Sequence, residues 1–168
     1  FLAQVAEARG KYLVQACSPI TGMSAEYAEF DGSPMSRKLG WSNDRHDWFY
    51  SDSYRTAANI GLDYEWFGID EGQCAAVDRL QEFLLEDARR NQFHTYEING
   101  TVAQSDVLHP VAIIATVAQG SLAANNPFTN EWIERFWNTP MRTGVRRYYD
   151  NCLYFFAFLA LSGKYRIW

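Results

Sequence analysis

The sequence predicts an all-α fold, and three observations support this class. Apolar residues recur every three or four positions over most of the chain, which is the spacing of amphipathic helices. Long stretches rich in turn-forming residues separate these helical segments. Only one short segment carries the alternation and the turn of a hairpin. With 168 residues, 48% of them apolar, the chain has the length of one domain or of part of a larger one.

The first half of the chain predicts three helices and one long loop. Residues 1–17 form the first predicted helix, and residues 18–48 form the loop because they contain several turn-forming pairs. A second helix is expected over residues 53–67, ending at Gly68, and a third over residues 71–90. The expected apolar face of the third helix is Ala75, Ala76, Leu80, Phe83 and Leu84.

The second half predicts a hairpin and three more helices. Residues 93–103 contain an Asn-Gly pair between short alternating stretches, which favours a small hairpin. Helices are expected over residues 110–124, where Pro110 suits the first helical position, over residues 130–137 and over residues 144–162. The expected inner face of the last helix is Tyr149, Cys152, Leu153, Phe156, Leu159 and Ala160.

Charge and hydropathy argue against two classes of partner. The net charge is −5 and lysine and arginine form no run, so we expect no nucleic-acid partner. The longest apolar run, residues 153–161, is far too short to cross a bilayer, so we expect no membrane partner. An acidic chain is compatible with a neutral ligand such as a carbohydrate.

The cysteines and histidines form no disulfide or metal-binding pattern. Cys17, Cys74 and Cys152 are scattered among apolar neighbours, which indicates buried free thiols in a reducing compartment such as the cytoplasm. The three histidines have no metal-ligand spacing with the cysteines or with one another. We therefore expect neither a metal nor a cofactor.

The segment around Asp52 carries the most chemistry. Asp52 and Arg55 lie at the start of the second predicted helix, where the helix dipole and the arginine can hold the carboxylate ionised. Aromatic side chains, whose faces can stack on pyranose rings, surround this pair in the sequence: Trp48, Phe49, Tyr50, Tyr54, Tyr64, Trp66 and Phe67. This combination is typical of a sugar-cleaving cleft. The alternative is that Asp52 caps the helix and the aromatic residues fill the core.

Three segments resemble the C-terminal half of glycoside hydrolase family 8. They are residues 51–68 (SDSYRTAANIGLDYEWFG), 18–34 (SPITGMSAEYAEFDGSP) and 146–168 (RRYYDNCLYFFAFLALSGKYRIW). Within that family, residues 106–110 (DVLHP) are most similar to the reducing-end xylose-releasing exo-oligoxylanases. The resemblance implies an (α/α)6 barrel, of which residues 1–168 would form the C-terminal part of a single catalytic domain. It also implies hydrolysis of β-1,4-xylosidic bonds with inversion, which needs two carboxyl groups on opposite faces of the sugar.

The resemblance implies roles for two residues in particular. Asp52 matches the general base of the family, and Arg55 would orient it and contact substrate. His109 would lie in a kinked Leu-His-Pro loop and bond the anomeric hydroxyl of the terminal xylose, since a neutral imidazole can both donate and accept. The alternative for His109 is a helix-entry residue in front of Pro110.

Three tyrosines are further candidates for contact with the sugar. The family places a tyrosine near the cleft at the start of the last helix, where this chain has Tyr148 and Tyr149. One of the two would face the sugar, and the sequence leaves open which. Tyr27, in the long loop, would lie on the rim of the cleft or anchor the loop.

The general acid of the family is a glutamate in the N-terminal half, and no glutamate of this chain matches it. The chain begins without methionine and already in helical periodicity, so we expect it to be cut from something longer and to be inactive alone. Two alternatives remain open at this point. One is an endo-acting family 8 xylanase, endoglucanase or chitosanase, and the other is a non-catalytic helical module that binds carbohydrate.

Overall fold

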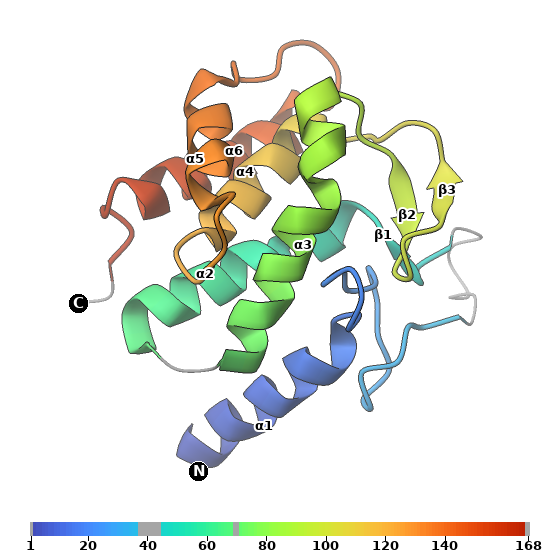
Figure 1. The fold of residues 1–168 in the computed structure, drawn as a ribbon, viewed down its shortest axis with the longest axis vertical. Coiled ribbons are helices and arrows are strands. Elements are labelled where there is room, and N and C mark those ends of the chain that lie inside the picture. Colours follow the sequence, from blue (N-terminus) through green and yellow to red (C-terminus); the bar gives the residue numbers. More distant parts are fainter. Residues whose placement is uncertain (1, 37–44, 69–70, 167–168) are drawn as a thin grey trace.

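The computed structural model describes residues 2–36, 45–68 and 71–166, and it confirms the all-α class (Figure 1). Six α-helices are present in this part of the chain: α1 (Leu2–Ala16), α2 (Arg55–Phe67), α3 (Glu71–Arg90), α4 (Pro110–Gly120), α5 (Thr129–Asn138) and α6 (Arg147–Leu161). A 3-10 turn, η1 (Ser51–Tyr54), leads directly into α2. The architecture is part of an (α/α)6 barrel. None of the helices in the described ranges is long and apolar enough to cross a bilayer.

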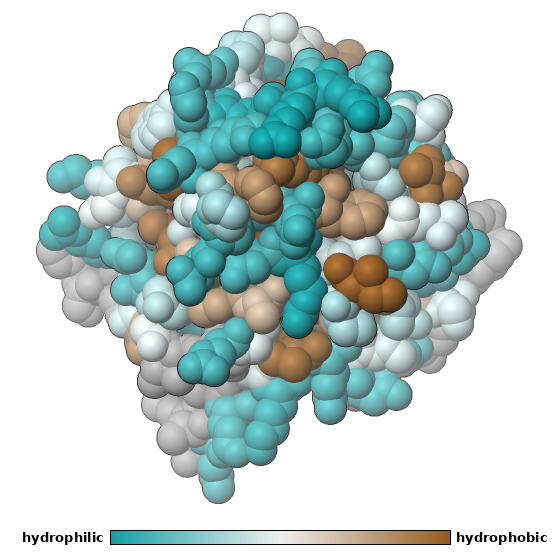
Figure 2. All heavy atoms as spheres, in the orientation of Figure 1, coloured by the Kyte–Doolittle hydropathy of each residue, from teal (hydrophilic) through white to brown (hydrophobic). Residues whose placement is uncertain are grey.

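The centre of the molecule is α4, which packs against α2, α3, α5 and α6. Every residue from Ala112 to Gly120 is buried. A helix that is hydrophobic on all sides belongs in the interior, because no face of it gains from contact with water. Figure 1 shows α3 crossing in front of α4. The surface over α3 is mostly hydrophilic, with apolar side chains in separate spots (Figure 2).

One glycine and two buried glutamines allow the neighbouring helices to pack closely against α4. A Cβ atom on Gly61 of α2 would lie 2.3 Å from the carbonyl oxygen of Gln119, so only glycine allows the two helices to approach this closely. The Gln119 Nε2 donates to the Ala58 carbonyl on α2 at 3.1 Å. From α3, the Gln81 Nε2 donates to the Val117 carbonyl at 3.0 Å. These amides pair backbone carbonyls across three helices, which offsets the cost of their burial.

A small antiparallel sheet lies beside the helices. The predicted hairpin is confirmed as β2 (Thr95–Glu97) and β3 (Val102–Gln104), with Gly100 at φ +97° in the turn. A third strand, β1 (Trp48–Phe49), pairs with β2 and was not predicted, because two residues give no detectable alternation. Since only Tyr50 separates β1 from η1, the sheet fixes the backbone that leads to Asp52.

Several predicted helix boundaries require correction. The helix predicted over residues 53–67 begins as η1, and the one predicted over 110–124 ends at Gly120. Beyond Gly120 the chain forms tight turns, in which the N–H groups of Ser121, Leu122 and Ala123 bond the carbonyl three residues earlier. The last helix begins at Arg147 rather than at residue 144, because Arg146 has a left-handed backbone with φ +66°.

The predicted inner face of α6 was also wrong in part. The buried residues of this helix are Asp150, Leu153, Ala157 and Ala160. Phe156, which was expected inside, is 43% exposed, and its neighbours Phe155 and Phe158 are exposed as well. Phe156 was predicted to lie inside because it is hydrophobic. The close contact of α6 with α4 instead favours the small side chains of Ala157 and Ala160 on the buried face.

The prediction of free cysteines is confirmed, but the prediction that they are buried holds for only one. All three cysteines are free thiols. Cys17 is buried, and this burial raises the pKa of its thiol to about 11. Cys74 and Cys152 are half-buried.

Candidate active site

Asp52 and Arg55 form an ion pair at the entrance to α2. The Asp52 Oδ1 lies 2.9 Å from Nη2 of Arg55, and the two side chains are 40% and 49% exposed. Asp52 does not cap the helix, because the residue at the α2 N-cap position is Tyr54, without a side-chain cap bond. The prediction of Asp52 as a cap is therefore wrong. The carboxylate instead keeps access to water while a cation holds its orientation.

The turn around Asp52 is held in an unusual backbone conformation. Ser51 has φ +34°, which is uncommon for a residue with a side chain. The Ser53 hydroxyl accepts a hydrogen bond from the Tyr50 N–H at 2.8 Å. These features fix the direction in which the Asp52 side chain leaves the backbone.

Tyr149 brings the base candidate and the specificity candidate together. Its hydroxyl donates to the Ser51 carbonyl at 2.8 Å, one residue before Asp52. Its ring centroid lies 4.5 Å from that of His109. Burial raises the pKa of Tyr149 to about 12, so the phenol stays protonated and can donate. Tyr148 is 83% exposed, so of the two tyrosines it is Tyr149 that lies between Asp52 and His109.

His109 is held by a buried carboxylate that the sequence analysis missed. The His109 Nδ1 lies 3.0 Å from Oδ2 of Asp150, which is completely buried in the first turn of α6. Arg142 bonds the same carboxylate oxygen at 2.5 Å. His109 does stand at the N-cap position of α4, as the helix-entry alternative expected, but its side chain makes no cap bond. No local sequence pattern indicates this contact, because Asp150 lies 41 residues after His109 in the chain.

Three consecutive residues at the start of α6 hold three different segments. Tyr149 bonds the turn before Asp52, and Asp150 bonds the start of α4. Asn151 bonds the backbone of Arg142 twice, since its Oδ1 accepts from the N–H at 2.8 Å and its Nδ2 donates to the carbonyl at 2.9 Å. The first turn of α6 therefore aligns the loops of the candidate site.

Tyr27 lies against a second buried pair rather than against Asp52. Its ring packs edge-on against His46 at 4.7 Å between centroids. The His46 Nδ1 lies 2.8 Å from Oε2 of Glu26, and the two side chains are only 7% and 10% exposed. No local pattern in the sequence predicts this pair, because Glu26 and His46 lie 20 residues apart. Besides burial, the negative charge of Glu26 contributes to the raised pKa of Tyr149.

The predicted aromatic surround of Asp52 is only partly correct. Phe49 and Tyr54 pack against each other in the core, with their ring centroids 5.0 Å apart. Trp66 belongs to the other end of α2, a helix of 13 residues that extends about 20 Å at 1.5 Å per residue. The Trp66 Nε1 donates to the Tyr165 carbonyl at 3.1 Å, so this ring packs on the C-terminal segment.

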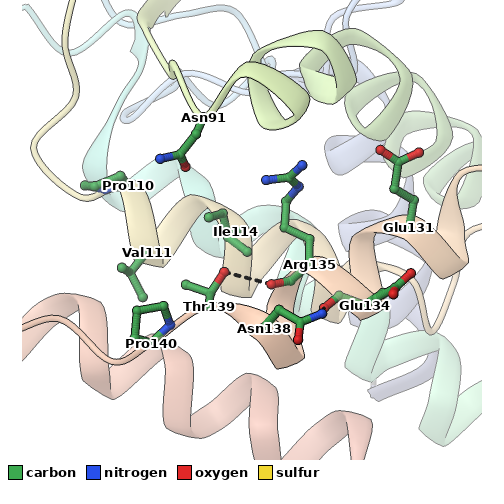
Figure 3. Close-up of a pocket in the computed structure, with 10 residues that line it drawn as sticks. All are labelled: Asn91, Pro110, Val111, Ile114, Glu131, Glu134, Arg135, Asn138, Thr139 and Pro140. Atoms are coloured by element: carbon green, nitrogen blue, oxygen red, sulfur yellow. Dashed lines mark hydrogen bonds between the residues drawn. The ribbon is translucent and has the colours of Figure 1, made fainter.

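A pocket of about 560 Å³ opens beside the start of α4 (Figure 3). Arg135 projects into it from α5, and Pro110, Val111 and Ile114 of α4 form part of its wall. The pocket contains neither Asp52 nor His109. Its glutamates offset the charge of Arg135, so its lining does not select an anion. Within the described ranges, no group of three or more histidine, cysteine, aspartate or glutamate side chains could hold a metal ion.

Comparison with known proteins gives close relatives over the whole chain. The chain is 49% identical over 168 residues to the reducing-end xylose-releasing exo-oligoxylanase Rex8A of Paenibacillus barcinonensis. It is 51% identical over 173 residues to a protein of the same description from Bifidobacterium adolescentis. These alignments include 100% and 99% of this chain but only 43% and 44% of the relatives. No protein-family model matches the chain.

Solved structures agree with these relatives. A double mutant of Rex8A, in which a leucine and the adjacent histidine are replaced by alanine and serine, matches with a TM-score of 0.91 and 47% identity. The match includes 98% of this chain and 42% of that structure. Rex8A complexed with xylose matches with a TM-score of 0.86 and 48% identity, over 93% of this chain and 40% of that structure.

Proposed function

We propose that the protein containing this chain, a part-length homologue of the reducing-end xylose-releasing exo-oligoxylanases of glycoside hydrolase family 8, releases xylose from the reducing end of xylo-oligosaccharides. The identity of about half of all residues carries this proposal. The arrangement of Asp52, Tyr149 and His109 supports it, because Tyr149 contacts both the residue before Asp52 and the ring of His109. The proposal extends to a cytoplasmic location, which the free thiols support.

In the proposed mechanism Asp52 is the general base of an inverting hydrolysis. It takes a proton from a water molecule that attacks the anomeric carbon, while a glutamate outside this chain protonates the leaving oxygen. Such carboxyl groups stand roughly 6.5–9.5 Å apart to leave room for the water. The exposure of Asp52 fits this role, since the base must contact water, and Arg55 at 2.9 Å holds the carboxylate in place.

His109 is the proposed determinant of reducing-end selectivity. It would bond the anomeric hydroxyl of the terminal xylose, a group that exists only at a free reducing end. The solved Rex8A variant carries substitutions at an adjacent leucine and histidine. Leu108-His109 is the only Leu-His pair in this sequence, so it is the pair that can correspond to those two positions. Of the two tyrosines at the start of α6, Tyr149, which packs on His109, is the proposed substrate contact, together with Tyr27 and Arg55.

The first test compares xylotriose with its reduced form, in which the terminal sugar is an open-chain alditol. The protein containing this chain should release xylose from xylotriose and cleave the reduced form poorly. The new reducing end should appear first as the α anomer, since inversion of a β bond gives that anomer. Equal cleavage of both substrates would indicate an endo-acting relative, and binding without cleavage would indicate a carbohydrate-binding module.

Asp52→Asn tests the proposed base. Loss of a general base lowers kcat by about 10²–10⁴-fold, while KM changes little because the asparagine keeps the shape of the side chain. The matched control is Asp47→Asn, since Asp47 also pairs with an arginine, Arg45, but lies before β1. Equal losses in the two variants would show that Asp52 acts only through folding. The 168-residue chain alone should be inactive because it supplies no matching general acid.

A further inference from the structure

The carboxylate of Asp150 is completely buried and fully engaged. Its Oδ1 accepts a hydrogen bond from the Ala112 N–H at 2.8 Å. Its Oδ2 accepts one from Nη1 of Arg142 at 2.5 Å and lies 3.0 Å from Nδ1 of His109. A buried carboxylate is tolerated when donors and a cation surround it, and all three of these partners can donate.

This arrangement decides which nitrogen of the imidazole carries the hydrogen. A carboxylate that accepts from a backbone N–H and a guanidinium acts as acceptor at both oxygens, so His109 must donate from Nδ1. In a neutral imidazole the other nitrogen, Nε2, then carries a lone pair and accepts. Among the residues that the structure describes, Nε2 of His109 has no hydrogen-bond partner. It is therefore available to a donor on a ligand.

Arg142 holds the histidine from the backbone side as well. Its Nη1 also donates to the carbonyl of Leu108, the residue before His109. Asn151 fixes the Arg142 backbone through the two bonds given above. With Tyr149 packed on the ring, the imidazole is restrained by a hydrogen bond to Asp150, by its own backbone and by an aromatic face.

We propose that Asp150 and Arg142 are positioning residues that fix the hydrogen of the His109 imidazole on Nδ1, so that Nε2 accepts a hydrogen bond from the anomeric hydroxyl of the reducing-end sugar. This inference rests on the proposed function and deepens it, because it assigns the direction of that hydrogen bond. The site then requires a donor at the anomeric position. A substrate whose terminal sugar lacks this hydroxyl, such as the 1-deoxy analogue of xylotriose, is bound less well.

The first experiment does not depend on activity. NMR of the full-length protein with ¹⁵N-labelled histidine, with His109 assigned by His109→Gln, reports which ring nitrogen is protonated. We expect Nδ1 to carry the hydrogen in the native protein. In Asp150→Asn the amide can donate to Nδ1, so the hydrogen should move to Nε2. A native His109 protonated at Nε2, or at both nitrogens near neutral pH, would overturn the inference.

The second experiment is a double-mutant cycle on selectivity, the ratio of kcat/KM for xylotriose to that for its 1-deoxy analogue. Asp150→Asn should lower this ratio about tenfold, as expected when a site loses its partner for a substrate hydroxyl. The loss should come from a higher KM for xylotriose. In a His109→Ala background Asp150→Asn should change the ratio no further. Equal losses on both substrates, or a further loss in that background, would indicate a merely structural role and overturn the proposal.

Arg142→Met and Arg147→Met form a matched pair in case Asp150→Asn folds poorly. Arg147 lies five residues later, at the start of α6, and is exposed. Among the described residues, its side chain bonds only the Gly144 carbonyl. Arg142→Met should lower the selectivity ratio, whereas Arg147→Met should leave it unchanged. Identical ratios in both variants would contradict the role of Arg142. If the native protein cleaves neither substrate, the proposed function fails, and the NMR measurement alone decides the protonation of His109.

Discussion

One side chain, that of Tyr149, joins the two parts of the candidate site. The phenol of Tyr149 donates to the Ser51 carbonyl, and its ring packs on His109. The turn that presents Asp52 and the imidazole that would bind the sugar therefore share one support. A shift of this side chain would disturb the water-activating group and the sugar-binding group together.

Tyr149→Phe separates the hydrogen bond from the ring contact. Loss of the bond should cost about 1 kcal/mol of stability. Because the Asp52 turn is then less well fixed, we expect kcat/KM to fall about tenfold, since small displacements of reacting groups are costly. Tyr148→Phe, at an exposed position, should behave like the native protein in thermal unfolding and in xylotriose assays. A loss of the same size in Tyr148→Phe would contradict the role assigned to Tyr149.

Among the residues of the candidate site, the sequence predicted those that stand in a local pattern and missed those whose partners are distant in the chain. Asp52 and Arg55 lie three positions apart, and His109 stands in a recognisable Leu-His-Pro trace. Asp150 could not be recognised, because it looks like one polar residue in an apolar helix and its partner is distant in sequence. The Glu26–His46 pair was missed for the same reason.

At the scale of helices and strands, the hydrophobic periodicity of the sequence predicted the helices but not all of their ends and buried faces. All six helices were predicted, and α3 has the predicted bounds. A continuous apolar run predicts a buried helix but not its end, so the tight turns after Gly120 were assigned to the helix. The face of α6 was misplaced because small residues against α4 matter more there than large ones. Neither effect is visible in one segment considered alone.

The contact between α2 and α4 can be tested at Gly61. In Gly61→Ala the new Cβ would lie 2.3 Å from a backbone oxygen of Gln119, so the helices must move apart. Such overpacking costs about 1–3 kcal/mol, although alanine has the higher helix propensity. The control is Asn59→Ala on the exposed side of α2, which should be neutral or stabilising. Chemical denaturation of both variants measures the difference, and a stabilised Gly61→Ala would contradict the close approach.

At the scale of the whole molecule, the surface of α6 and its surroundings is richer in exposed large apolar side chains than the surface over α3. Over α3 the surface is mostly hydrophilic (Figure 2). Large apolar side chains are exposed on α6 and its surroundings: Trp137, Met141, Val145, Tyr148, Phe155, Phe156 and Phe158. Isolated exposed apolar residues are ordinary, but a concentration of aromatic ones indicates a surface that is covered in use. The chain spans less than half the length of its relatives, which is consistent with such a surface.

The 168-residue chain alone should therefore self-associate. Sedimentation velocity should show species larger than the monomer as the concentration rises. Phe155→Ser should weaken this association, because Phe155 is 55% exposed on α6. Ile20→Ser is the matched control, since Ile20 is 73% exposed in the loop after α1. A monomer at all concentrations, or an equal effect of both variants, would contradict this interpretation of α6.

The row Tyr149, Asp150 and Asn151 has a consequence for how the gene can change. Successive residues of an α-helix point about 100° apart, so each of the three reaches a different segment. A point mutation releases one segment and leaves the other two attached. A single-codon insertion or deletion directly after Asn151 rotates all three by that angle relative to the rest of α6 and releases every segment at once. Family members should therefore vary in length in the loop before α6 but not in the first turns of this helix.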